Sequence, residues 1–105
     1  MCQLRKLGRK GNCCIMECVD CRNVYLLYKD VSVTITSYAL KRMADCVQQI
    51  EFGDYCVEMQ DGQQRIVVNT PHPHVHFNLS DEDFESLKIA LWESACMQEV
   101  YELLD

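Results

Sequence analysis

The cysteines are concentrated near the N-terminus, where two of them have the spacing of metal ligands. The sequence contains eight cysteines, and five of them precede Arg22: Cys2, Cys13, Cys14, Cys18 and Cys21. Cys18 and Cys21 are separated by two residues, and this spacing on a tight turn lets two thiolates bind one tetrahedral ion. Zinc favours thiolates in that geometry. The sequence therefore predicts a structural zinc site that includes Cys18 and Cys21.

A structural zinc site needs four ligands, so the pair requires companions. Cys2 would reach the pair if residues 2–7 and 13–18 form neighbouring strands. The fourth ligand is left open between Cys13, Cys14 and a histidine. The opposing interpretation is that all these cysteines are small, partly buried side chains that pack on a sheet, as free cysteine commonly does.

The three histidines form a second group of metal-binding side chains. They are His72, His74 and His76, in a short segment interrupted by prolines. On a strand, His74 and His76 would share one face and could offer two imidazoles to one ion. A combined site with Cys18 and Cys21 would require both segments to be neighbours. The alternative is that these histidines form the polar outer face of an edge strand, where the nearby prolines discourage pairing with a further strand.

Motifs of the common enzyme classes are absent from the sequence. It contains no G-x-S-x-G, no phosphate-binding glycine loop and no H-E-x-x-H. A redox C-x2-C usually opens a helix, whereas the residues after Cys21 indicate a strand. We therefore favour a non-enzymatic module with zinc as its metal. Three alternatives stay open: a cysteine-based metal or redox sensor, a small metal-dependent enzyme using His74 and His76, and a metal-free protein-interaction module.

Charge is distributed unevenly along the chain. The net charge is −6, yet the first eleven residues carry four basic and no acidic residues, so the remainder carries −10. An acidic body argues against binding a nucleic-acid backbone, which requires clustered lysine and arginine. No apolar run reaches the roughly 18 residues of a membrane span. No secretory signal is visible, so we expect a cytoplasmic protein with reduced thiols.

Hydrophobic patterning predicts one α+β domain over residues 1–105. Helices are expected from about Thr36 to Gly53 and over 81–104. The strands should form an antiparallel sheet with both helices packed on one face. A shift of 44 residues superimposes the two strand–helix junctions, which suits two β-β-β-α repeats. The expected strands cover 2–7, 13–18, 22–28, 31–36, 55–60, 64–70 and 74–79.

The C-terminal helix carries two apolar stripes, one more than a small sheet can cover. The first stripe contains Phe84, Leu87, Leu91 and Ala95. The second contains Ile89, Trp92, Cys96, Val100 and Leu103. A homodimer built on the second stripe is the expected partner. The alternative is that the first helix or the N-terminal segment covers this stripe.

Several short motifs together resemble a family of small bacterial proteins of unknown function. They are the opening Met1-Cys2, the glycine at position 11, the Cys18-x2-Cys21 pair and Tyr25-x-Leu27, followed by a strand that leads into a helix. The resemblance implies a fold but no activity. It also implies that Cys2 accompanies Cys18 and Cys21.

Overall fold

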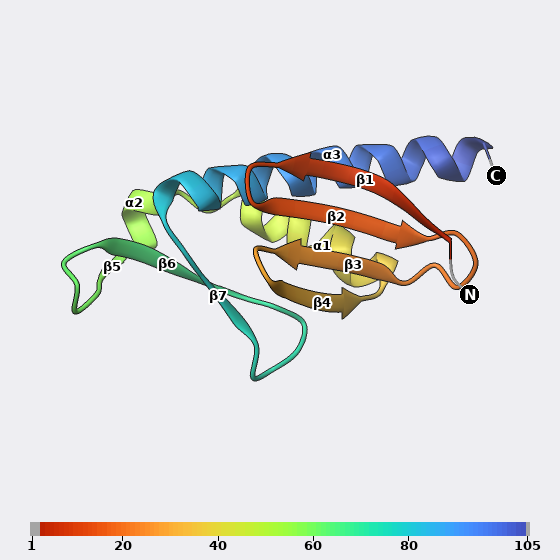
Figure 1. The fold of residues 1–105 in the computed structure, drawn as a ribbon. Coiled ribbons are helices and arrows are strands. Elements are labelled where there is room, and N and C mark those ends of the chain that lie inside the picture. Colours follow the sequence, from red (N-terminus) through yellow and green to blue (C-terminus); the bar gives the residue numbers. More distant parts are fainter. Residues whose placement is uncertain (1–2, 105) are drawn as a thin grey trace.

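The computed structural model describes residues 3–104, which form two antiparallel sheets and three helices (Figure 1). The first sheet has four strands in sequence order: β1 (Leu4–Lys10), β2 (Cys13–Cys18), β3 (Val24–Tyr28) and β4 (Val31–Ile35). The second sheet contains β5 (Val57–Glu58), β6 (Gln64–Asn69) and β7 (His76–Leu79). The helices are α1 (Ser37–Gln48), α2 (Phe52–Tyr55) and α3 (Asp81–Leu104).

Local sequence explains where the two long helices begin. The hydroxyl of Thr36 accepts a hydrogen bond of 3.0 Å from the Ala39 N–H, which caps α1. The hydroxyl of Ser80 accepts one of 3.2 Å from the Asp83 N–H at the start of α3. Acidic residues in the first turn of α3 further stabilise its N-terminus. Both caps confirm the helix starts predicted from the sequence. The predicted end of the first helix at Gly53 is wrong, because α1 ends at Gln48 and Gly53 lies within α2.

Both long helices lie on one face of the first sheet (Figure 1). α3 packs along β1 and β2, and α1 packs against α3. One hydrophobic core joins the inner faces of both sheets to the helices. Tyr28 of β3 and Phe77 of β7 connect the sheets directly, with ring centroids 5.5 Å apart. None of the helices within 3–104 is both long enough and apolar enough to cross a membrane.

The contact between β1 and α3 is unusually close. A Cβ atom at Gly8 would lie 2.6 Å from the carbonyl oxygen of Ala90 and 2.7 Å from Oγ of Ser94. Gly11 has a φ of 55°, and a Cβ there would lie 2.7 Å from Oγ of Ser86. Both positions therefore require glycine, the first because of space and the second also because of its backbone conformation.

The α+β class and the antiparallel strand pairing are confirmed, but the strands form two sheets. β5 has only two residues, because the one-turn helix α2 occupies part of the segment expected to be a strand. β7 begins at His76 and not at residue 74, since a turn precedes it. Three antiparallel strands followed by a helix occur twice, as β2–β4 with α1 and β5–β7 with α3. Duplication of an ancestral unit stays a prediction.

Asp83 joins the start of α3 to the first sheet. Its carboxylate accepts a hydrogen bond of 2.6 Å from the Tyr28 hydroxyl and one of 3.1 Å from Nδ2 of Asn12. Nζ of Lys29 lies 3.7 Å away. The Tyr28 hydrogen bond is the main cause that lowers the pKa of Asp83 below its usual range, against the opposing effect of burial.

We predict that Tyr28→Phe lowers the free energy of unfolding by about 1.5–3 kcal/mol at neutral pH, because it removes a hydrogen bond to a charged group. The folded-state pKa of Asp83 lies below the unfolded value. Its contribution is therefore complete above about pH 4 and is lost as pH falls through the folded pKa. Urea unfolding should show the two proteins converging in stability as the pH falls below the ordinary carboxyl range and Asp83 becomes protonated in the folded state.

The matched control is Tyr55→Phe, which alters an exposed tyrosine on α2 and should change stability little at any pH. A Tyr28→Phe effect of constant size across the acid range would contradict the role given to Asp83.

Candidate functional site

The Cys18–Cys21 segment forms a tight turn between β2 and β3. The Arg22 N–H donates a hydrogen bond of 2.9 Å to the Cys18 carbonyl, and the Cys18 N–H donates one of 2.9 Å to the Asn23 carbonyl. Arg22 closes the turn with a φ of 66°, a conformation uncommon outside glycine. The Cys21 N–H then points at Sγ of Cys18 across 3.4 Å. Cys18 is 0% exposed, so this N–H supplies a polar contact to a fully buried sulfur, whereas Cys21 is exposed.

The start of the described chain lies at the same turn. Leu4 of β1 pairs with Cys18 of β2, which confirms that these two segments are neighbouring strands. The Val19 N–H donates a hydrogen bond of 2.9 Å to the Gln3 carbonyl. The Gln3 N–H donates one of 3.1 Å to Oδ2 of Asp20. Cys2, the third predicted ligand, adjoins Gln3 in the sequence and lies outside the described residues.

The other N-terminal cysteines lie far from this turn. Cys13 and Cys14 begin β2, whereas Cys18 ends it. Five steps of extended chain separate Cys13 from Cys18, a distance of about 16 Å. Cys13 is 1% exposed, and burial followed by the charge of Asp83 raises the pKa of its thiol to about 11. Neither residue supplies the fourth ligand of the turn, and Cys13 is a packing residue of the core.

The histidines are exposed and dispersed around the β6–β7 connection. His74 lies in the turn before β7, so it does not share a strand face with His76. Nε2 of His72 lies 2.7 Å from the Thr34 carbonyl on β4. Within residues 3–104, no three or more histidine, cysteine, aspartate or glutamate side chains converge to hold a metal ion. The structure therefore does not assemble the combined site of Cys18, Cys21, His74 and His76.

A buried carboxylate beside the turn was missed by the sequence analysis. Glu17 is 2% exposed, and its Oε1 accepts hydrogen bonds of 2.9 and 2.7 Å from Nε and Nη2 of Arg5. Nη1 of Arg22 lies 3.7 Å from the same oxygen. Nε2 of Gln98, on α3, donates a hydrogen bond of 3.3 Å to Oε2. The guanidinium of Arg5 also stacks over the ring of Tyr101, 3.8 Å from its centroid.

This Glu17 cluster (Glu17, Arg5, Arg22, Gln98 and Tyr101) links the cysteine turn to α3. Glu17 directly precedes Cys18, and Arg22 directly follows Cys21, so both ends of the turn are held by the same carboxylate. The alternation of residues along β2 predicts that Glu17 is buried, because Cys13, Ile15 and Glu17 share the inward face of the strand. An acid at an inward position requires a partner on a neighbouring element.

The second stripe of α3 is exposed in the single chain. Ile89 is 41% exposed, Trp92 61%, Val100 45% and Leu103 88%. A shallow hollow between this stripe and β1 is lined by Leu7, Trp92, Glu93, Cys96, Met97 and Val100. Neither α1 nor the described N-terminal strand covers the stripe, so the alternative of coverage within the chain is wrong for residues 3–104.

Comparison with known proteins identifies a family but no activity. The model of a family of unknown function, DUF6686, matches residues 1–105, and the chain belongs to this family. This confirms the resemblance to a family of unknown function that the sequence analysis stated. The curated proteins and the solved structures gave no match.

We predict that Glu17→Gln lowers the free energy of unfolding by about 3 kcal/mol, because it leaves two arginines without their buried counter-charge. Urea denaturation at neutral pH measures this loss. The matched control is Glu58→Gln, which neutralises an exposed acid on β5 and should change stability by less than about 0.5 kcal/mol. Equal effects of the two substitutions would show that the Glu17 cluster does not stabilise the fold.

Proposed function

We propose that the protein is a small non-enzymatic module whose N-terminal strands are held by a structural zinc ion bound to Cys2, Cys18 and Cys21. The observation that carries the proposal is the Cys21 N–H directed at Sγ of Cys18 across 3.4 Å. The Cys21 N–H gives the buried sulfur of Cys18 a hydrogen-bond donor, and Glu17 and Arg22 flank and hold the turn. The hydrogen bonds that Gln3 accepts from Val19 and donates to Asp20 support Cys2 as the third ligand.

A metal at this turn would stabilise the part of the sheet that lacks neighbours. β1 is an edge strand, paired only with β2. Zinc would tie the start of β1 to the β2–β3 turn, and its binding energy would add directly to the free energy of unfolding. Because Glu17 directly precedes the turn and accepts a hydrogen bond from Gln98 of α3, the same ion would also restrain α3.

The metal or redox sensor is the second candidate, and the Glu17 cluster is the observation that favours it. Loss of the metal or oxidation of Cys18 or Cys21 would displace Arg22 or Glu17. The displacement would reach α3 through the hydrogen bond between Glu17 and Gln98. A static structural site and a sensor differ in reversibility. Zinc that is released and rebound on mild oxidation and reduction, with a change of oligomeric state, would select the sensor.

We predict that protein purified without an affinity tag contains about one zinc ion per chain. Cys2→Ser, Cys18→Ser and Cys21→Ser should each lose the metal, because three thiolates bind one ion. Cys96→Ser is the control, since Cys96 is exposed on α3 and should retain the metal. Elemental mass spectrometry measures the stoichiometry, and removal of zinc by a chelator should lower the midpoint of urea unfolding.

Metal-free wild-type protein, or full zinc content in both Cys18→Ser and Cys21→Ser, would contradict the zinc site. The protein would then be a metal-free interaction module. Zinc content that depends on His74 and His76 would instead favour the metal-dependent enzyme.

We further propose that the exposed stripe of α3 binds a second copy of the chain. Charge complementarity favours this partner: Lys6 and Arg9 are exposed on β1, and Glu93 and Glu99 are exposed on α3. Two antiparallel copies of α3 would bring the basic strand of one copy toward the acidic helix of the other. Trp92 of each copy would enter the hollow of its partner, as a two-fold interface requires.

We predict that the wild-type protein sediments as a dimer and that Trp92→Glu sediments as a monomer, because a carboxylate would be buried in the interface. Analytical ultracentrifugation at micromolar concentration measures both. Tyr55→Glu is the control, since Tyr55 is equally exposed, at 65%, but lies on α2. A monomeric wild-type protein, or a dimer that tolerates Trp92→Glu, would contradict this interface.

A further inference from the structure

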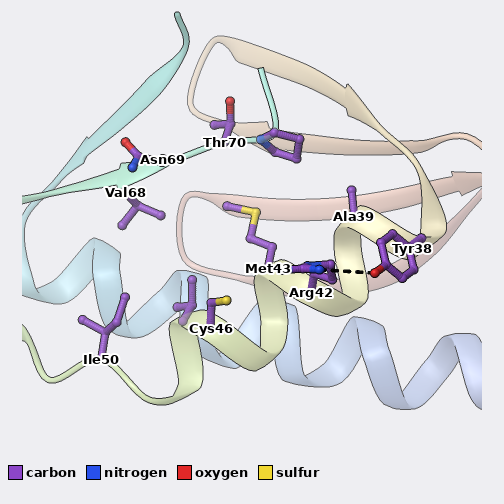
Figure 2. Close-up of a pocket in the computed structure, with 11 residues that line it drawn as sticks. Tyr38, Ala39, Arg42, Met43, Cys46, Ile50, Val68, Asn69 and Thr70 are labelled. Atoms are coloured by element: carbon purple, nitrogen blue, oxygen red, sulfur yellow. Dashed lines mark hydrogen bonds between the residues drawn. The ribbon is translucent and has the colours of Figure 1, made fainter. Parts of the chain in front are cut away.

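A groove between α1 and the end of β6 lies outside the proposed zinc site (Figure 2). Its volume is about 470 Å³, which falls within the roughly 300–1,000 Å³ typical of small-molecule sites. One face of α1 forms one wall, and the end of β6 with the following residues forms the other. Both elements were predicted from the sequence, but the space between them was not.

The interior of the groove is apolar. Met43 of α1 and Val68 of β6 lie on opposite walls, and Ile50 lies at one end (Figure 2). Val47 also lines the groove. Met43 is 7% exposed, so its flexible side chain belongs to the floor of the groove and can adapt to an occupant. An apolar body, and not a sugar or a nucleotide, suits such a surface.

Arg42 is the only charged residue that lines the groove. Its Nη1 donates a hydrogen bond of 3.2 Å to the hydroxyl of Tyr38, and the two side chains point toward each other at one end of the groove (Figure 2). Across the described part of the chain, no carboxylate lies within ion-pair distance of Arg42. A protein of net charge −6 therefore presents an unneutralised guanidinium at the rim of an apolar groove.

We propose that the groove binds a small carboxylate that carries an apolar body, such as a medium-chain alkyl carboxylate. The apolar chain lies on Met43, Val47 and Val68, and the carboxylate pairs with the guanidinium of Arg42, which has the fork geometry that binds carboxylates. Charge complementarity at Arg42 selects an anion over an alcohol or an amine of the same length. The site is independent of zinc and of the dimer interface.

Titration of isotope-labelled protein with decanoate, decanol and decylamine, followed by amide NMR spectra, tests this proposal. The largest changes in amide chemical shift are expected at Ala39, Asn69 and Thr70. Decanoate should bind about three- to tenfold more tightly than decanol. The indole N–H of Trp92, the only tryptophan, reports separately on the α3 stripe. Shifts confined to Trp92 and its neighbours would overturn the assignment to the groove.

Two pairs of variants decide which features of the groove matter. Arg42→Gln should remove the preference for decanoate over decanol, whereas Lys41→Gln on the same helix, outside the groove lining, should retain it. Cys46→Phe should fill the groove and weaken both ligands at least tenfold, whereas Asp45→Phe, which is exposed outside the lining, should not. A preference that survives Arg42→Gln, or binding that survives Cys46→Phe, would overturn the proposal.

Discussion

The close contact between β1 and α3 is the constraint on which the rest of the structure depends. Gly8 lets the strand approach the carbonyl of Ala90 and the hydroxyl of Ser94, where any side chain would collide. Once this contact is made, α3 lies along β1 and β2, and the rest of the same face of the sheet is left for α1 (Figure 1). The cysteine turn, at the far end of β2, is consequently held beside the second half of α3 by Gln98 and Tyr101.

The Glu17 cluster specifies this arrangement more than it stabilises it. Burying a carboxylate and an arginine costs desolvation energy that their attraction only partly returns. An apolar side chain at Glu17 could give similar stability, but it would accept many positions of β1 and α3. Its oxygens accept hydrogen bonds from Arg5 of β1 on one side and from Gln98 of α3 on the other, so these directional bonds fix the position of the strand relative to the helix.

The sequence was sufficient to predict the starts of the two long helices and the four strands of the first sheet, because each carries its own periodicity or cap. Thr36 and Ser80 marked the helix starts, and alternation marked the strands of the first sheet. The neighbouring positions of β1 and β2, and hence of Gln3 and the cysteine turn, followed from the same pattern. The helix stripe containing Trp92 was also predicted correctly as a surface that the chain itself does not cover.

Features that depend on the relative positions of distant elements could not be predicted. The separation into two sheets depends on how β6 and β7 pack over the core, which no local pattern encodes. The groove beside Arg42 is a space between two elements, and single-sequence periodicity describes only their faces. Glu17 could have been recognised as buried from the alternation of β2, but its partner Gln98 is 81 residues away.

The separation of 81 residues between Glu17 and Gln98 has a consequence for synthesis of the chain. β1 and the cysteine turn are made before the helix that covers them. Until α3 leaves the ribosome, Leu7, Glu17 and the N-terminal thiols have no apolar or ionic cover from it. Contacts between such distant segments form slowly, because the intervening chain must first be closed into a loop. The nascent protein therefore passes through a stage in which its cysteines are accessible to metal ions, chaperones and oxidants before the final helix encloses the sheet.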